Sequence, residues 1–308
     1  MKVERIEFLG WPNCYRLDNE QIQLVVTTDV GPRIIFCALK DGQNLFKVFE
    51  QDAGKTGAAE WHNYGGHRFW HAPEEKPRTY FPDNHPVSLE VHEDFIRLIQ
   101  PEEPTTRIQK ELDLALDEGH PEAMVTHRLR NRGAWSVELA PWGLSVMDGG
   151  GVAVLPLPPR GSHRDFLLPS NTLALWPYTD LADARWISGK EFLMLRQDAQ
   201  AESPQKIGIH TPRSWGAYVN HGVLFLKQVD YVNGATYPDL NSNFEVFTNS
   251  AMLELESLGP LTSLAPGETV EHTERWALLG DTATPGGEAD IHTHLLPKIG
   301  AVLQRWEA

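Results

Sequence analysis

The chain has 308 residues, of which 42 are Asp or Glu and 27 are Lys or Arg, giving a formal net charge of −15 at pH 7. This acidity argues against a nucleic-acid partner, because phosphate binding needs a basic surface. Hydrophobic residues make up 41% of the chain, enough for a substantial core. No apolar run reaches the roughly 20 residues of a membrane-spanning helix. The amino-terminal residues lack the apolar stretch of a signal peptide, and two cysteines are too few for a disulfide framework. We therefore expect a soluble, cytoplasmic protein without a membrane partner.

Strand-like segments dominate the sequence. In chain order, the clearest runs are residues 21–30, 32–39, 87–100, 107–116, 123–131, 135–147, 221–231, 244–249, 251–258 and 269–279. They alternate apolar with polar residues or are rich in β-branched residues, and Gly, Pro, Asn or Asp separates them. We expect about 16 to 18 strands, at the spacing typical of a sandwich or barrel.

Helical patterns are scarce, and the best one lies near the carboxyl terminus. Residues 297–306 begin with a proline that suits a first helical turn. Their apolar stripe consists of Ile299, Val302, Leu303 and Trp306. No linker, charge block or low-complexity run divides the chain. The sequence therefore predicts an all-β protein, a single domain over residues 1–308 built from two large, mostly antiparallel sheets, with this short terminal helix.

The segment of residues 61–74, WHNYGGHRFWHAPE, concentrates side chains suited to chemistry. Its two glycines allow a turn or a close approach to a ligand. If the following residues form a strand, His67 and His71 project from one face. Arg68 and Trp70 then project from the other face. An imidazole can transfer protons beside an aromatic ring that stacks on a sugar, which makes this segment a candidate cleft wall.

Two other interpretations of these histidines remain open. In the first interpretation, the histidines cap loops or fill the core. In the second, His62, His67 and His71 hold a metal ion, since histidine is a common metal ligand. Their spacing, however, matches no zinc or iron motif, so the sequence favours a site without a metal.

A pair of carboxylates marks a second segment, residues 251–258. Strand alternation puts Met252, Glu254 and Glu256 on one face. Two such carboxylates lie roughly 6 to 7 Å apart. On a solvent-facing side they need no special role. If they line a concavity, repulsion and partial burial raise at least one pKa, so that one carboxylate can act as a base near neutrality.

Residues 254–268 resemble the carboxy-terminal signature of the galactose mutarotase-like superfamily, which includes aldose epimerases and hexose-phosphate epimerases. In that signature a strand ends in the catalytic glutamate, and a hydrophobic-x-Pro-Gly-Glu step leads to the last strand. Residues 25–46 are similar to the opening of the family, and residues 65–74 occupy the place of its Gly-Gly segment. Residues 126–146 are similar to its central strand pair. The resemblance covers most of the chain in order and implies the supersandwich fold.

The resemblance also implies a reaction. It points to a mutarotase-like or epimerase-like isomerase that acts on a free sugar or sugar acid by general acid–base catalysis, without a cofactor. Glu256 best matches the catalytic glutamate, with Glu254 as the alternative. The family carries a second catalytic histidine after its N-x-G turn, where this sequence has Ala-Pro-Trp-Gly at residues 140–143. Either another histidine (His67, His71 or His127) replaces it, or the reaction has been lost.

The sequence thus yields one leading hypothesis and two alternatives. In the leading hypothesis Glu256 is the base, and His67 or His71 is the acid. The expected substrate-binding residues are Arg68, Trp70, Trp142, Glu245 and Glu254. One alternative is a non-catalytic sugar-binding module that keeps the cleft but lacks the second acid. The other is a metal-assisted lyase or hydrolase that uses the three histidines of residues 62–71 and a glutamate. In each case the expected partner is a small carbohydrate.

Overall fold

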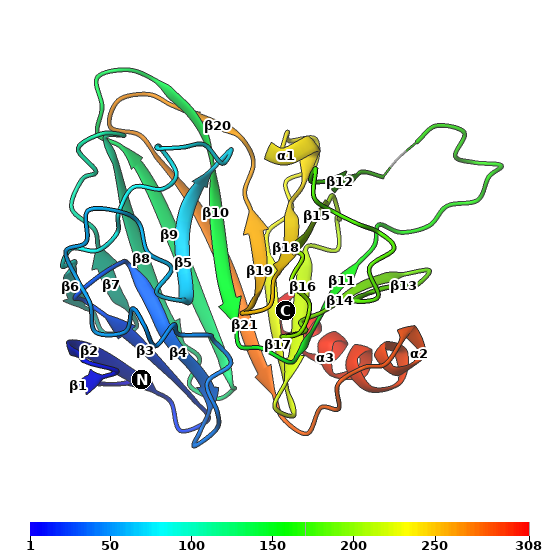
Figure 1. The fold of residues 1–308 in the computed structure, drawn as a ribbon, viewed down its shortest axis with the longest axis horizontal. Helices are drawn as coiled ribbons and strands as arrows, with labels where there is room; N and C mark the ends of the chain where they lie inside the picture. The colour runs from blue at the N-terminus through cyan, green and yellow to red at the C-terminus, as the bar shows by residue number, and fades with distance from the viewer. Residues whose placement is uncertain (170, 308) are drawn as a thin grey trace.

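The computed structural model describes residues 1–169 and 171–307, which form two large antiparallel sheets packed face to face (Figure 1). The first sheet has 11 strands. In spatial order they are β1 (Lys2–Phe8), β2 (Trp11–Asp18), β3 (Ile22–Thr27), β4 (Arg33–Leu39), β5 (Gly66–Ala72), β10 (Val137–Met147), β19 (Leu253–Leu258), β18 (Phe244–Thr248), β15 (Gln205–Ile209) and β12 (Leu173–Leu175), while β20 (Thr262–Leu264) pairs with β10. The all-β sandwich predicted from the sequence is confirmed.

The second sheet has 10 strands. In spatial order they are β13 (Trp186–Ser188), β14 (Phe192–Arg196), β11 (Val152–Pro156), β16 (Trp215–Asn220), β17 (Val223–Val229), β21 (Thr269–Leu279), β9 (Glu122–Asn131), β8 (Ile108–Leu116), β7 (Ile96–Ile99) and β6 (Ser88–Val91). The helical segments are α1 (Pro238–Asn241), α2 (Glu288–Asp290), the π-helical turn η1 (Ile291–Leu295) and α3 (Leu296–Glu307).

The described residues contain 21 strands, more than the sequence predicts. Part of the difference comes from very short strands at the sheet margins, such as β12, β13 and β20. Part comes from residues 87–100, which form β6 and β7 rather than one strand. The chain reverses between them, where the amide of His92 donates to the carbonyl of Phe95. The polar pair Glu93 and Asp94 occupies this turn.

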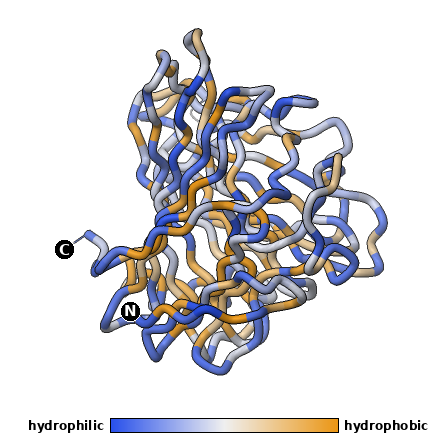
Figure 2. Tube along the Cα trace, turned by 90° about the vertical axis from the view of Figure 1, so that its left-hand side faces the viewer, coloured by the Kyte–Doolittle hydropathy of each residue, from blue (hydrophilic) through white to orange (hydrophobic). Residues whose placement is uncertain are grey.

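The main hydrophobic core lies between the two sheets. β8 alternates buried and half-buried residues along its whole length, as expected for a strand with one face against the core. In contrast, β5 is buried at every position, so both of its faces are covered. Figure 2 shows hydrophobic residues alternating with hydrophilic ones along many strands, while the turns at its lower edge are mostly hydrophilic. Because both faces of β5 are buried, the outer face of the first sheet must be covered by other parts of the chain at its centre.

The carboxy-terminal helix covers the outer face of the second sheet. Ile299 and Val302 of α3 are buried in a cluster with Phe192, Trp215 and Leu226. This contact fixes the last helix on the side of the molecule opposite the outer face of the first sheet. Among the described residues, no helix combines the length and the apolar character needed to cross a lipid bilayer.

Candidate functional site

The candidate site is a cavity of about 270 Å³ on the outer face of the first sheet, and we call it the candidate pocket. Strand pairing brings its polar residues into adjacent rows. Leu144 on β10 stands opposite both Arg68 on β5 and Glu256 on β19, and Glu256 stands opposite Glu245 on β18. The residues that line the cavity are Trp61, Asn63, Arg68, Trp70, Glu74, Tyr80, Trp142, Leu144, Tyr178, Lys206, Phe247, Met252 and Glu254. Aromatic rings therefore make up much of the wall.

One side of the pocket holds an ion pair stacked on indole rings. Nη2 of Arg68 lies 2.9 Å from Oε1 of Glu254, and both side chains are almost completely buried. The Arg68 guanidinium carbon lies 4.5 Å from the ring centroid of Trp70 and 5.4 Å from that of Trp61. Cation–π contact and pairing with a carboxylate hold the guanidinium in one place. Nε and Nη1 of Arg68 have no hydrogen-bond partner in the described structure.

The opposite side holds a buried cluster of one lysine and two glutamates. Nζ of Lys206 lies 2.8 Å from Oε2 of Glu245 and 3.0 Å from Oε2 of Glu256. The indole Nε1 of Trp142 donates a 2.8 Å hydrogen bond to the same oxygen of Glu256. Oε1 of Glu256 has no partner among the described residues. Glu256 therefore lies behind the pocket wall, with one oxygen held by two donors and the other buried without a hydrogen-bond partner among the described residues.

Burial and mutual repulsion set the protonation of this cluster. Burial raises the pKa of Glu256, and it raises the pKa of Glu245 well above its ordinary value, although Lys206 opposes both shifts. Burial lowers the pKa of Lys206, but the two carboxylates outweigh it, so the net shift is well upward. One cation thus faces two buried carboxylates. Such a cluster can hold an extra proton and exchange it with a ligand.

The structure brings together the substrate-binding residues that the sequence suggested. Arg68, Trp70, Trp142 and Glu254 line the candidate pocket. Glu245 lies behind the pocket wall, in contact with Lys206. Of the two candidate bases, Glu254 faces the cavity beside Arg68, and Glu256 is completely buried beneath Trp142 and Lys206.

The two histidines expected to act with Glu256 lie on the other face of β5. His67 points into the space between the sheets, where its Nε2 lies 2.7 Å from Nε2 of His127. His71 is buried on the same side, and its ring nitrogens have no partner among the described residues. Burial lowers the pKa of His67 well below its ordinary value and that of His71 to about 3. The structure therefore does not bring His67, His71 or His127 to the pocket, because the sheet itself separates them from it.

The three histidines considered as metal ligands do not come together either. His62 is partly exposed and lies 3.2 Å from Asp52, away from the inter-sheet histidines. Within residues 1–169 and 171–307, one set of potential metal ligands gathers, His67, His127 and Glu274, whose ligand atoms lie within 4.8 Å of one another. Each of these three side chains already forms hydrogen bonds with other protein groups.

Lys206 is the main residue of the candidate site that the sequence does not point to. It stands in β15, a strand of five residues, and 50 positions separate it from Glu256. A single lysine in a short strand normally faces solvent, so its local sequence carries no signal. The pairing of β15 with β18 and of β18 with β19 brings it to the carboxylates. Tyr80 and Tyr178, which also line the pocket, come from loops whose position the strand pattern does not predict.

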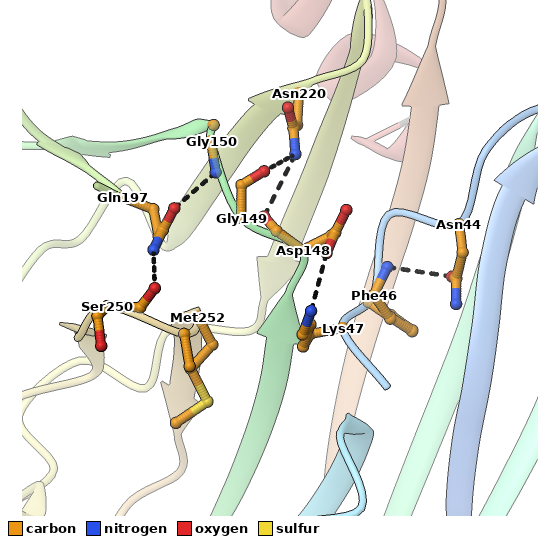
Figure 3. Close-up of polar contacts among 12 residues, drawn as sticks. Asn44, Phe46, Lys47, Asp148, Gly149, Gly150, Gln197, Asn220, Ser250 and Met252 are labelled. Carbon is orange, nitrogen blue, oxygen red and sulfur yellow. Dashed lines mark hydrogen bonds and ion pairs between the residues drawn. The ribbon is translucent and has the colours of Figure 1, made fainter. Parts of the chain in front are cut away.

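A polar clamp fixes the strand ends next to the pocket (Figure 3). Gln197 accepts a 2.7 Å hydrogen bond from the amide of Gly150, which follows β10. Its amide nitrogen donates to the carbonyls of Asn249 and Ser250, in the turn between β18 and β19. Met252, two residues further on, lines the pocket. The clamp therefore holds β10 and the β18–β19 turn in fixed relation at one end of the site.

The arrangement of the two sheets is shared with solved structures. The chain has the galactose mutarotase-like fold. A galactose mutarotase-like protein from Lactobacillus casei has a TM-score of 0.59 at 9% identity, over 87% of this chain and 100% of its own. A putative aldose 1-epimerase from Escherichia coli has a TM-score of 0.52 at 13% identity, over 87% and 99% of the two chains. A putative mutarotase from Salmonella typhimurium has a TM-score of 0.55 at 9% identity, over 87% and 90%.

These likenesses confirm the fold expected from the sequence resemblance. At 9 to 13% identity they establish the fold alone, because one fold hosts many chemistries. No protein-family model matches the sequence, and no curated protein sequence matches it. Function must therefore be argued from the side chains of the pocket.

Proposed function

We propose that the candidate pocket binds a free sugar and that the protein interconverts its anomers by general acid–base catalysis. The observation that carries this proposal is the Glu256 carboxylate, which has one oxygen held by Trp142 and Lys206 and the other unpartnered. A reactive carboxylate behind an aromatic-lined cavity is a suitable arrangement for proton transfer to a bound sugar.

The size and lining of the pocket favour a single sugar ring. Its volume of about 270 Å³ lies near the lower end of the roughly 300–1,000 Å³ typical of ligand sites. The aromatic rings offer apolar faces against which the C–H faces of a sugar can pack. Arg68 and Glu254 lie on the same wall and can donate to and accept from sugar hydroxyls.

In the proposed reaction Glu256 is the base. Its free oxygen takes the proton of the anomeric hydroxyl as the bond between the anomeric carbon and the ring oxygen breaks. The Lys206 ammonium group donates a proton to the ring oxygen. Lys206 thus replaces the catalytic histidine that the resemblance places near Trp142. Rotation about the bond between the first two carbons, followed by the reverse proton transfers, closes the ring as the other anomer. Atoms and charges balance, and acid–base help of this kind contributes about 10²–10⁴ in rate.

Access to Glu256 requires a movement of Lys206. Glu256 has no exposed surface, and Lys206 lies between it and the cavity. A lysine side chain has four rotatable bonds, so its ammonium group can turn from Glu256 toward a bound sugar. That turn would expose the base and deliver the acid in one step.

A specific observation favours a second candidate function, non-catalytic sugar binding. Trp142 stands where the resemblance places a catalytic histidine, and Glu256 has no exposed surface. A protein that recognises a sugar without converting it needs the aromatic pocket but not an accessible base.

One-dimensional NMR saturation transfer on a panel of aldoses and uronic acids separates the two functions. Transfer of saturation between the anomeric protons, present with the wild type and lost with Glu256→Gln, supports the isomerase. Ligand line broadening without exchange on any sugar supports the binding module. An absence of both effects contradicts the sugar proposal.

A further inference from the structure

A buried ion pair lies between the sheets, directly behind the strand that carries Glu256. Nζ of Lys227 on β17 lies 3.0 Å from Oε1 of Glu274 on β21, and neither side chain has exposed surface. The two residues belong to the second sheet, whereas Glu256 belongs to the first. An ion pair of this kind is expensive to desolvate and contributes little to stability by itself. A contribution to stability therefore does not explain why Lys227 and Glu274 are paired at this position.

The pair contacts the residues on both sides of Glu256. Lys227 donates a 3.1 Å hydrogen bond to the carbonyl oxygen of Leu255. The hydroxyl of Ser257 donates a 2.5 Å hydrogen bond to Oε1 of Glu274. Because side chains alternate along a strand, Ser257 faces the second sheet while Glu256 faces the candidate pocket. The backbone of β19 is thus anchored one residue before and one residue after the proposed base.

Further hydrogen bonds hold the carboxylate of Glu274 in place. Nε1 of Trp276 donates to its Oε2 at 2.7 Å, and Nε2 of His272 lies 2.8 Å from the Ser257 hydroxyl. Gly143 on the facing strand leaves the necessary space, because a Cβ there would lie 2.2 Å from Oε1 of Glu274. We call Lys227, Glu274 and Ser257 the anchoring network.

The neighbouring histidines complete a cluster that is bonded internally. His127 donates from Nδ1 to the carbonyl of His272 at 2.9 Å, so its Nε2 accepts from Nε2 of His67 in the neutral state. Nδ1 of His67 then accepts from the hydroxyl of Ser145, 2.9 Å away. None of these side chains has an unpartnered buried atom in the described structure. Hydrogen bonds between protein groups therefore account for the whole cluster.

We propose that Lys227 and Glu274 are positioning residues, which hold β19 so that Glu256 points at Lys206 and the candidate pocket. This inference rests on the proposed function, in which Glu256 is the base. Lys227 and Glu274 do not touch the pocket and act only through the backbone and Ser257.

The double variant Lys227→Met/Glu274→Gln tests the inference without leaving an unpaired charge in the core. Its matched control is Lys110→Met/Glu103→Gln, because Lys110 and Glu103 form a second buried ion pair, 2.6 Å apart, in which Lys110 belongs to β8. We expect the anchoring-network variant to lose about tenfold or more in kcat for anomer exchange, with KM changed less than twofold. The control should lose comparable stability and keep kcat. A folded network variant with the kcat of the wild type would overturn the inference.

A milder variant tests the inference if the double variant does not fold. Ser257→Ala removes one hydroxyl and leaves both charges in place, and we expect a threefold or larger loss of kcat at unchanged KM. Wild-type kcat in this variant, when the double variant does not fold, would also overturn the inference.

A separate readout keeps this inference distinguishable from the proposed function. If the wild type exchanges no sugar anomers, the titration midpoint of Glu256 is measured by carbon-13 NMR of labelled glutamate carboxyl groups, assigned with Glu256→Gln. A midpoint that differs from wild type in the network variants but not in the control supports positioning of Glu256 by the network. Identical midpoints in all of these proteins contradict it.

Discussion

Trp142 and Glu256 are joined by a 2.8 Å hydrogen bond from the indole nitrogen to one carboxylate oxygen, across the paired strands β10 and β19. The resemblance to mutarotases places a catalytic histidine near this tryptophan. Here the indole donates to the carboxylate and cannot transfer a proton to a substrate. In the proposed reaction the tryptophan therefore orients the base, and the acid comes from another strand. We propose Lys206 as that acid, because its Nζ contacts the Glu256 carboxylate.

Trp142→Phe is expected to destabilise the protein and to disturb Glu256. The substitution keeps an aromatic ring but removes a donor from a buried carboxylate, which costs about 1–3 kcal/mol. Trp61→Phe is a matched control, because the indole nitrogen of Trp61 has no hydrogen-bond partner among the described residues. Urea denaturation at pH 7 measures the free energy of unfolding of both variants. Equal losses in the two variants would show that the Trp142 hydrogen bond contributes nothing.

Lys206→Met is expected to cause a loss of stability that grows with pH. Without the lysine, two buried carboxylates remain uncompensated, which costs about 3–5 kcal/mol at neutral pH. Burial already raises the pKa of Glu245 and Glu256 above their unfolded values, so the folded state binds more protons and loses stability as pH rises. Removing the cation that opposes these shifts strengthens this trend.

Denaturation of Lys206→Met from pH 5 to pH 8 checks this prediction. The difference in the free energy of unfolding between Lys206→Met and the wild type should be smallest at pH 5 and largest at pH 8. Lys40→Met is the control, since Lys40 pairs with Asp18 at the surface and such pairs contribute about 0–1 kcal/mol. A deficit that does not change with pH would contradict the assignment of Lys206 as the counter-ion of both carboxylates.

The sequence predicts the local part of the site well. Alternation alone separates His67 and His71 from Arg68 and Trp70, and the structure has them on opposite faces of β5. Alternation does not tell which face is turned to the pocket, because that depends on how the second sheet packs. From the sequence alone, Glu256 therefore pairs with His67 or His71, although the structure places both histidines behind the sheet.

The non-local part could not be predicted. Lys206 reaches Glu256 only through the order in which β15, β18 and β19 pair, and nothing near position 206 encodes that order. Likewise, Lys227 and Glu274 look like ordinary strand residues until the two sheets face each other. Buried charges that meet across sheets lack a periodic signature, whereas the fold class follows from the repeated strand pattern itself.

His71→Leu is expected to make the protein more resistant to acid. Burial lowers the pKa of His71 to about 3, below the unfolded value of about 6.5. The unfolded state thus binds more protons between these values, and stability falls as pH falls through that interval. At 1.36 kcal/mol per pH unit, the wild type loses about 2–3 kcal/mol from this group between pH 7 and pH 4.5.

Chemical denaturation at pH 7 and pH 4.5 measures the effect of His71→Leu. The variant should gain about 2–3 kcal/mol relative to wild type at the lower pH. The exposed histidine His163 provides the control, because its surroundings change little on unfolding. If His71→Leu and wild type lose equal stability on acidification, His71 is not buried in the neutral form.

Gly143→Ala is expected to break the anchoring network. A methyl group at this position would lie 2.2 Å from Oε1 of Glu274, so the carboxylate must move away from Ser257 and Lys227. Removing one partner of a buried ion pair costs about 3–5 kcal/mol, and a displacement that keeps both charges should destabilise by less than that. Gly300→Ala is the control, since no atom beyond its chain neighbours and the adjacent backbone of helix α3 lies within 4 Å of the added carbon, and alanine there should stabilise by about 0.5–1 kcal/mol. Thermal unfolding that is unchanged in Gly143→Ala would contradict the geometry of the network.

The role of Glu256 is decided by anomer exchange, measured for the wild type and for Glu256→Gln at a sugar concentration where both proteins bind the same sugar. If Glu256 is the base, saturation transfers between the two anomeric protons with the wild type. The exchange rate then falls at least about 10²-fold in Glu256→Gln, while the sugar dissociation constant changes little. Equal exchange by the two proteins would show that Glu256 is not the base and would contradict the proposed mechanism.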